Sequence, residues 1–196
     1  MDKITNKKQL KDFLNLEIKG KSLLHLYLNQ QYTFVFIYYL RHMEYHYNNW
    51  NNNHMSFYHG LLYLFYHTLW RKWSLKTGIT IPKNVCGKGL TLMHWGSIVV
   101  NGASRIGRNC CFINNINIGA NGGSPKAPII GDNVYIGPGA VLFGDITIAD
   151  GCYIGANAVV NKSCYEPNSI LIGVPARVVR TEPMCWWEKN NWKRNK

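Results

Sequence analysis

The chain repeats an aliphatic residue every six positions through its C-terminal half. The repeated positions are Ile130, Ile136, Leu142, Ile148, Ile154 and Val160. Four residues after each comes a second small or apolar residue, at Val134, Ala140, Ile146, Cys152, Ala158 and Cys164. A helix would scatter these positions around its axis, and a flat strand would repeat every two residues. A strict period of six predicts short strands joined by bends, three to a triangular coil of about eighteen residues, with coils stacked about 4.8 Å apart.

The same period continues towards the N-terminus. Its first position holds Val100, Ile106, Phe112 and Ile118, and its second position holds Cys86, Leu92, Ile98, Ser104, Cys110 and Ile116. The glycines and prolines of residues 119–128 predict a loop that leaves the coil. Ile172 and Val178 return to the register after a break at residues 165–167. The repeat therefore predicts a prism of five to six stacked coils from about Ile79 to Val179.

The first part of the chain lacks this period and has helical spacing instead. We expect helices near Lys8–Ile18, Tyr32–Tyr45 and Met55–Leu75, with Phe57, Leu61 and Leu64 on one face of the last. The asparagine-rich run Tyr47–His54 is predicted to be a polar connection. The predicted organisation is an α-helical cap (1–76), a β-helix (77–180) and a C-terminal tail (181–196) whose structure the sequence does not indicate.

Composition limits the cellular context. No apolar run reaches the roughly 20 residues that cross a bilayer, and the N-terminus does not resemble a signal peptide, so we expect a cytoplasmic protein. Four cysteines stand where the repeat needs small inward residues, which favours reduced core thiols: Cys86, Cys110, Cys152 and Cys164. Cys111 and Cys185 lack the spacing of metal ligands, and no metal is expected.

The formal net charge is +12, and no Asp or Glu occurs between Glu44 and Asp132. Such a basic field suits an anionic partner, which could be a phosphorylated cofactor, a phosphate-linked lipid carrier or a nucleic acid. No segment has the pattern of a nucleic-acid-binding motif, so we do not expect nucleic acid as the partner.

Three segments carry a family resemblance: Gly131–Ala140, Ile154–Val160 and the Gly-Val-Pro-Ala-Arg run Gly173–Arg177. They resemble the hexapeptide-repeat acyltransferases, and within these the serine acetyltransferase-like branch with its relatives in surface-polysaccharide clusters. The resemblance covers about residues 75–180. It implies a mainly β fold, a left-handed parallel β-helix behind the N-terminal α-helical cap. It also implies a homotrimer with acetyl-CoA bound in the grooves between neighbouring prisms.

Small residues at the corners fit the implied acyl donor, because an extended pantetheine arm could lie against backbone amides there. Those assigned to the cofactor are Gly137, Gly139, Ala140 and Ala158. Tight corners require small residues in any case, so both explanations stay open. Cations at the end of the prism could meet the nucleotide phosphates, although a solvated basic edge would look similar. These cations are Lys162, Arg177 and Arg180. Backbone amides near Gly119 could stabilise an oxyanion.

His94 is the candidate catalytic residue. It occupies the first position of the repeat, six residues before Val100, where its successors are aliphatic. The segment Leu92–Val100 resembles the family's histidine-containing coil, in which the histidine is the general base that takes a proton from the acceptor hydroxyl. A histidine packed at a corner is the alternative, and Lys88 also breaks the aliphatic rule one repeat earlier.

The acceptor is predicted from departures from the family pattern. Serine acetyltransferases have an Asp fifteen residues before the histidine and another directly before it, and here these positions hold Ile79 and Met93. Because an ammonium-bearing acceptor needs carboxylates, we expect a sugar hydroxyl of a surface polysaccharide or its lipid-linked precursor. Serine O-acetylation (cysteine biosynthesis) and a non-catalytic β-helix binding protein are the alternatives. Residues expected at the acceptor are Glu44, Trp95, Asn114 and Lys126.

Aromatic and basic residues cluster in the predicted helices, with Trp70, Arg71, Lys72 and Trp73 near the end of the last one. Such a surface either packs against a neighbouring chain or contacts the inner face of the plasma membrane peripherally.

Overall fold

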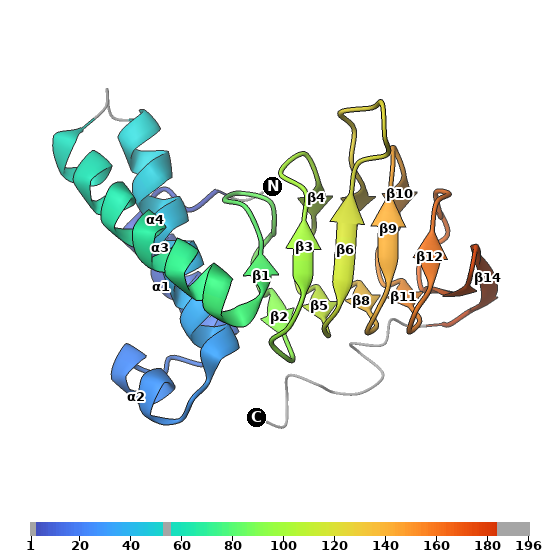
Figure 1. Cartoon of the computed structure of the whole chain (residues 1–196), viewed down its shortest axis with the longest axis horizontal. Helices are drawn as coiled ribbons and strands as arrows, with labels where there is room; N and C mark the ends of the chain where they lie inside the picture. The colour runs from blue at the N-terminus through green and yellow to red at the C-terminus, as the bar shows by residue number, and fades with distance from the viewer. Residues whose placement is uncertain (1–2, 53–55, 184–196) are drawn as a thin grey trace. The chain divides into compact units, whose positions relative to one another are not determined.

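The computed structural model describes residues 3–52 and 56–183, which form two compact units, Met1–Ile79 and the chain from Thr80 onward (Figure 1). The first unit is helical. Its elements are α1 (Lys7–Glu17), α2 (Leu23–Leu28), α3 (Tyr32–Asn52) and α4 (Phe57–Thr77).

Three of these helices were predicted, and α2 was not. α1 begins at a capping box, in which the Asn6 side chain accepts from Gln9 N–H and the Gln9 side chain accepts from Asn6 N–H. The predicted polar connection is wrong for residues 47–52, because α3 continues through them. Their asparagines fit the helix since Asn48 donates to Ile4 O (3.1 Å) and Asn49 donates to Tyr45 O (2.8 Å). Residues 53–54 lie outside the described residues.

α3 and α4 pack side by side through aromatic rings, such as Trp50 stacked on Tyr63 and Phe36 near Trp70. The predicted apolar face of α4, with Phe57 and Leu61, is instead exposed. Within the described part of the chain, no helix is both long and apolar enough to cross a membrane.

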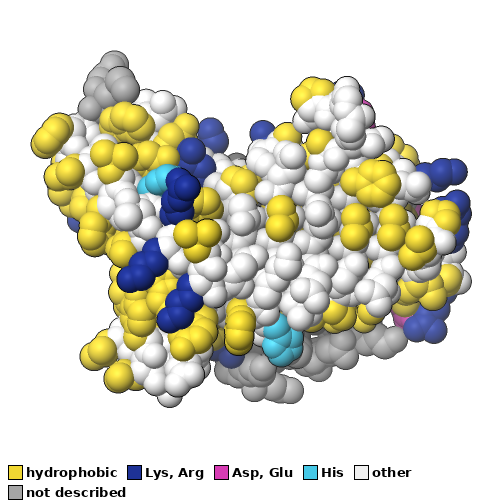
Figure 2. Space-filling model, viewed as in Figure 1, with side chains coloured by type: hydrophobic (Ala, Val, Ile, Leu, Met, Phe, Trp, Pro, Cys, Tyr) yellow, Lys and Arg dark blue, Asp and Glu magenta, His cyan; other side chains and the backbone are white. Residues whose placement is uncertain are grey.

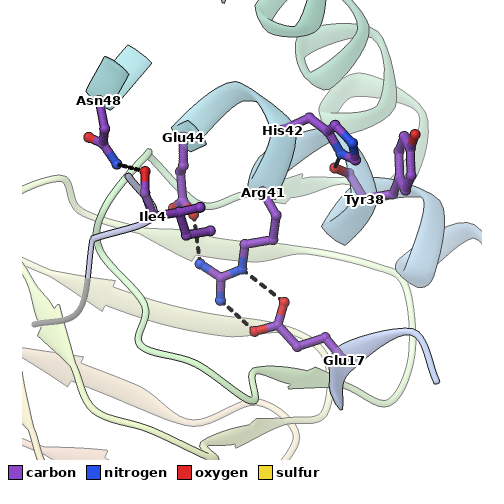
Figure 3. A network of polar contacts seen from close by, with 7 residues as sticks. All are labelled: Ile4, Glu17, Tyr38, Arg41, His42, Glu44 and Asn48. Carbon is purple, nitrogen blue, oxygen red and sulfur yellow. Dashed lines mark hydrogen bonds and ion pairs between the residues drawn. The ribbon is translucent and has the colours of Figure 1, made fainter. Parts of the chain in front are cut away.

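Figure 3 shows a buried ion network that joins α1 to α3. Arg41 donates from Nε and Nη2 to Glu17 at 2.8 and 2.7 Å, and from Nη1 to Glu44 at 2.8 Å. All three side chains are at most 2% exposed. Burial by itself lowers the pKa of Arg41, but the two carboxylates outweigh it and raise that pKa above its ordinary value. Arg41 is therefore held charged at the centre of the helical unit.

A histidine pair between α3 and α4 predicts a loss of stability in acid. His46 Nδ1 lies 3.0 Å from His59 Nδ1, so one neutral imidazole must donate to the other. Burial, helped by His59 and His42, lowers the pKa of His46 to about 4, below the roughly 6.5 of an unfolded histidine. The unfolded chain therefore binds more protons between these values, and the stabilisation present above about pH 6.5 is lost as the pH falls towards 4.

We expect the free energy of unfolding to fall by about 1–2 kcal/mol from this pair as the pH falls from about 7 to 5, a figure reduced for partial solvent screening. Urea unfolding at both pH values measures it. His46→Gln should remove most of this pH dependence, whereas His25→Gln, at an exposed position of α2, should not. Equal pH dependence in wild type and His46→Gln would contradict the assignment.

The second unit is a parallel β-helix of short strands. They are β1 (Ile79–Thr80), β2 (Thr91–Leu92), β3 (Ile98–Val100), β4 (Arg105–Ile106), β5 (Cys111–Phe112), β6 (Ile116–Gly119), β7 (Ile129–Ile130), β8 (Tyr135–Ile136), β9 (Val141–Phe143), β10 (Thr147–Ile148), β11 (Tyr153–Ile154), β12 (Val159–Val160), β13 (Ser169–Gly173) and β14 (Ala176–Thr181). Three sheets form the walls, in the orders β1-β3-β6-β9-β12, β10-β7-β4 and β14-β13-β11-β8-β5-β2. The predicted coils are confirmed.

The core of this unit consists of aliphatic columns, one inside each wall. Ile118 pairs with Leu142, and Ile136 pairs with Ile154, each from one coil to the next. The predicted first-position residues from Val100 to Val160 are all at most 2% exposed: Val100, Ile106, Phe112, Ile118, Ile130, Ile136, Leu142, Ile148, Ile154 and Val160. Ile118 and Ile130 lie twelve positions apart because the predicted loop leaves the prism between β6 and β7 (Figure 1).

Two parts of the predicted register are wrong. Cys86 and Leu92 pair with Ile106 and Phe112, so they stand in first-position columns rather than second ones. The reason is a corner between β2 and β3 that is two residues longer than its counterpart in the next coil. Cys164 likewise pairs with Ile148, a first-position residue.

The C-terminal end of the prism also differs from the prediction. Leu171, not Ile172, follows Ile154 in its column. The chain then reverses, and β14 pairs antiparallel with β13. Ile172 and Val178 are exposed rather than inward, because a hairpin and not a further coil ends the prism.

One edge of the prism is held by carboxylates that accept backbone N–H groups of the preceding coil. Asp132 Oδ1 accepts from Arg108 N (2.6 Å), and Asp150 Oδ1 accepts from Asp132 N (2.7 Å). The coils approach so closely here that a Cβ on Gly131 would lie 2.8 Å from Asp150 N and 3.0 Å from Ala149 C.

We therefore expect Gly131→Ala to destabilise the β-helix by about 1–3 kcal/mol, because the backbone of the next coil must shift. Thermal or urea unfolding measures the loss. Gly122→Ala is the matched control, since a Cβ there meets no atom within 4 Å. Equal stability of the two variants would show that this edge tolerates a wider coil spacing.

Candidate functional site

His94 lies in the longer corner that joins β2 to β3. β2 ends at Leu92, which pairs with Phe112, and β3 begins at Ile98, which pairs with Ile116. Residues 93–97 therefore form this corner, whereas only residues 113–115 form the equivalent corner of the next coil. The predicted inward position of His94 is thus wrong: the side chain belongs to an expanded corner and is exposed. An exposed imidazole beside a wall of the prism can reach a bound acceptor, which an inward one could not.

The corners below His94 stack on it to form one edge of the prism, which we name the His94 edge (residues 93–97, 113–115, 137–140 and 155–158). Ile116 N donates to Ser97 O at 2.9 Å, Gly139 N donates to Asn114 O at 3.0 Å, and Asn157 N donates to Pro138 O at 2.8 Å.

Seven of the predicted site residues lie on this edge. They are His94, Trp95, Asn114, Gly137, Gly139, Ala140 and Ala158. Trp95 is 61% exposed next to His94. The small corners are sterically required as well, because a Cβ on Gly137 would lie 2.9 Å from Ala156 N. Of the four small residues assigned to the cofactor, Gly139 is partly exposed and Gly137 is buried. Ala140 and Ala158 are fully buried inside the prism, so their side chains do not face a ligand.

Gly119, Lys126 and Lys162 lie on a second edge of the prism, which contains the loop between β6 and β7. We name it the loop edge (residues 101–104, 119–128, 143–146 and 161–163). Gly119 ends β6, and its O accepts from Gly144 N at 3.0 Å. Lys126 pairs with Asp145 at 2.5 Å, both side chains being exposed, and this hydrogen bond raises the pKa of Lys126. Lys162 is exposed in the last corner of this edge. Within one chain, these groups are therefore separate from the His94 edge.

The remaining candidates lie elsewhere. Arg177 and Arg180 are exposed on β14, where Arg180 Nε pairs with Glu182 at 2.8 Å. Glu44 belongs to the helical unit, where it is buried and pairs with Arg41. Its predicted role at the acceptor stays a prediction, and its carboxylate already has a structural partner.

Two residues of the His94 edge were not predicted. Gly96 has φ +134°, a conformation that L side chains rarely adopt, and it gives the long corner its turn. Asn157 has φ +56°, and its side chain occupies the space beside Gly139. Asparagine or glycine precedes an inward residue at many corners, as at Asn133 and Gly151, and this signal in the sequence could have found Asn157. It could not have found Gly96, because Ser97 after it is exposed.

Five cysteines are free thiols buried in the β-helix: Cys86, Cys110, Cys111, Cys152 and Cys164. Burial raises the pKa of Cys110 and Cys111 to about 12, so neither is a thiolate at neutral pH. Cys185 lies outside the described residues. Among residues 3–52 and 56–183, no three His, Cys, Asp or Glu side chains are grouped to hold a metal ion.

Comparisons with known proteins agree with this geometry. Residues 127–162 match the family of bacterial transferase hexapeptide proteins (six repeats). Serine acetyltransferase of Mycobacterium tuberculosis is 34% identical over 106 residues, 53% of this chain and 46% of that protein. Serine acetyltransferase of Staphylococcus xylosus is 36% identical over 109 residues, 54% of this chain and 50% of that protein. The chain thus spans about half the length of these curated relatives.

Solved structures extend the similarity. The Neisseria gonorrhoeae serine acetyltransferase in complex with serine has a TM-score of 0.65 at 26% identity, covering 89% of this chain and 70% of that one. The soybean serine acetyltransferase apoenzyme has a TM-score of 0.63 at 26% identity, covering 87% and 66%. A serine acetyltransferase complex with CoA has a TM-score of 0.66 at 25% identity, covering 88% and 71%.

The fold is therefore a left-handed parallel β-helix with an N-terminal helical region, as predicted. The predicted resemblance to the hexapeptide-repeat acyltransferases, on their serine acetyltransferase branch, is confirmed. The predicted sugar acceptor, in a polysaccharide or its lipid-linked precursor, is wrong. The relatives found by sequence and by structure are serine acetyltransferases, one of them in complex with serine, and they support the serine alternative.

Proposed function

We propose that this protein is an acetyl-CoA-dependent serine O-acetyltransferase. The observation that carries the proposal is the exposed His94 on the same prism edge as the glycine corners, in a fold similar to a serine acetyltransferase that holds serine and to one that holds CoA. The presence of a candidate base at that edge favours an enzyme over a β-helix that only binds.

In this proposal the acetyl group is transferred directly within a ternary complex. His94 takes the proton of the serine hydroxyl while that oxygen attacks the thioester carbonyl. Backbone N–H groups stabilise the oxyanion of the tetrahedral intermediate, and those near Gly119 are the candidates. As the intermediate collapses, the C–S bond breaks and the proton passes from His94 to the CoA sulfur. O-acetylserine and CoA are the products, and no metal takes part.

The acyl donor is assigned to the small corners and the nearby cations. We place the pantetheine arm along the corners that hold Gly137, Gly139, Ala140 and Ala158, because these residues put little side chain outside the prism. Ala140 and Ala158 are themselves fully buried, so they act by their small size. Exposed Lys162, Arg177 and Arg180 are candidates for the phosphates of the nucleotide. Asn114, Trp95 and Lys126 are candidates for the acceptor side.

The proposal includes a homotrimer. Most of the candidate residues lie on the His94 edge or on the loop edge, which one prism holds apart. Packing the His94 edge of one prism against the loop edge of the next would complete the site. Light scattering on the purified protein tests the trimer. We also place the protein in the cytoplasm, in peripheral contact with the inner face of the plasma membrane, and expect no nucleic acid as a partner.

We expect L-serine to be acetylated, but with a raised KM. Ile79 is fully buried and Met93 carries no charge, so neither can meet the ammonium group of serine as a carboxylate would. Met93→Asp should lower the KM for serine at least tenfold, since a charged hydrogen bond is worth about 1.5–3 kcal/mol. CoA release, with and without L-serine, measures both constants.

Leu28→Asp is the control, because it adds the same charge at an exposed position of α2 in the helical unit. It should leave the KM for serine unchanged. Absence of any serine-dependent CoA release, in the wild type and in Met93→Asp alike, would overturn serine as the acceptor.

A further inference from the structure

The outer face of α4 is apolar from Phe57 to Phe65 and again at Leu75. Six large apolar side chains there are between 56% and 84% exposed: Phe57, Tyr58, Leu61, Leu64, Phe65 and Leu75. At about 100° per residue they fall within an arc of about 120°. The opposite face, with Tyr66, Trp70 and Trp73, packs on α2 and α3. Because a helix that is apolar on both faces is normally buried on both, we expect a second partner to cover the outer face.

Charges on α4 are all positive. No Asp or Glu occurs between Phe57 and Thr77, whereas Arg71 and Lys72 are both exposed. At about 100° per residue, Lys72 falls within the apolar arc and Arg71 lies about 20° outside one edge of it. Lys76 lies over the rings of Tyr32 and Trp73 at 4.6 Å. Figure 2 shows hydrophobic side chains along α4 and Lys and Arg side chains towards its C-terminal end. The exposed face is thus an apolar strip over Phe57–Phe65 that is followed by two cations, with Leu75 beyond them.

From this arrangement we propose that the outer face of α4 docks on a membrane surface that contains anionic lipid. The aromatic and leucine side chains enter the interface between headgroups and acyl chains, and Arg71 and Lys72 reach lipid phosphates at the C-terminal part of the strip. The helix lies in the plane of the membrane because its other face is already occupied by the rings of α2 and α3. No helix among the described residues is suited to span the bilayer.

The rival occupant is a second copy of the chain. Two copies that met through the outer faces of their α4 helices would bring together two surfaces that both lack carboxylates, so the cations of each α4 would find no acidic partner on the other. An anionic membrane offers both an apolar phase and negative charge, which matches the whole strip. The inference does not depend on the acetyltransferase reaction.

Sedimentation of the full-length protein with lipid vesicles tests this surface. We expect binding to vesicles of phosphatidylglycerol mixed into phosphatidylcholine, little binding to phosphatidylcholine alone, and a loss of binding at about 0.5 M salt. Leu61→Ser/Leu64→Ser and, separately, Arg71→Gln/Lys72→Gln should each weaken binding at least tenfold. Leu24→Ser/Leu28→Ser is the matched control, because it removes two leucines of α2 that are even more exposed and should leave binding unchanged.

Circular dichroism establishes that each variant is folded, and light scattering follows its oligomeric state. Equal loss in the α2 control, or no vesicle binding by the wild type at low salt, would overturn the proposal. A change of oligomeric state in Leu61→Ser/Leu64→Ser, without any vesicle binding by the wild type, would assign the face to a second copy. Serine acetylation in solution should be unchanged in these variants, so a failure of the membrane surface and a failure of the proposed reaction are distinguishable.

Discussion

His94→Ala should lower kcat by about 10²–10⁴-fold while the β-helix stays folded and CoA stays bound. The size of the loss is that of a general base removed from proton transfer. Fold and CoA binding should survive because His94 is exposed in a corner and contributes nothing to the aliphatic columns. The rate of CoA release with L-serine measures the loss, and calorimetry with CoA measures the binding.

Two further variants separate catalysis from shape. His94→Gln keeps polar atoms at the corner but cannot accept and return a proton at neutral pH, so it should be as slow as His94→Ala. His25→Ala removes another exposed histidine, in α2, and should leave kcat unchanged. Near-normal turnover in His94→Gln would remove the base from the mechanism and favour a β-helix with another centre or none.

Arg41→Met should destabilise the helical unit by about 3–5 kcal/mol. The substitution leaves the carboxylates of Glu17 and Glu44 buried without their guanidinium, and an uncompensated buried charge is far more costly than a lost surface pair. It also removes the contact of the guanidinium with the Phe13 ring at 5.0 Å. Urea unfolding followed by the helical circular dichroism signal measures the change.

The matched control neutralises the carboxylates as well. Arg41→Met/Glu17→Gln/Glu44→Gln removes all three charges, so it should recover most of the stability that the single variant loses. If the triple variant were no more stable than Arg41→Met, the network would act through packing rather than through charge. Because the chain has two compact units, the unfolding of the β-helix should be followed separately.

Much of the β-helix could be predicted because its constraint is local and repeated. Each coil needs an inward aliphatic residue on every wall, so the pattern from Val100 to Val160 reveals the strands, the columns and the loop between Ile118 and Ile130. The candidate base, His94, was chosen because the segment Leu92–Val100 resembles the family's histidine-containing coil. Its placement was wrong, because a corner two residues longer than its neighbour has no marker in a six-residue period.

The acceptor was predicted wrongly for a related reason. Ile79 and Met93 stand at two positions where serine acetyltransferases have Asp, so they show only that two carboxylates are missing. The similarity to serine acetyltransferases extends over the whole prism. Substitutions at two positions change the affinity for an ammonium group, but they do not by themselves define a different acceptor.

The sequence by itself determined the coils and most of their core, because period and side-chain size act within each coil. Only the tertiary structure decided which corners stack on His94, how the terminal hairpin reverses at β14 and which face of α4 stays exposed. It also decided that Arg41 bridges Glu17 and Glu44, which are 24 and 3 positions away. These features depend on pairing between distant segments, and that pairing is set by the backbone hydrogen bonds and the burial of the folded chain.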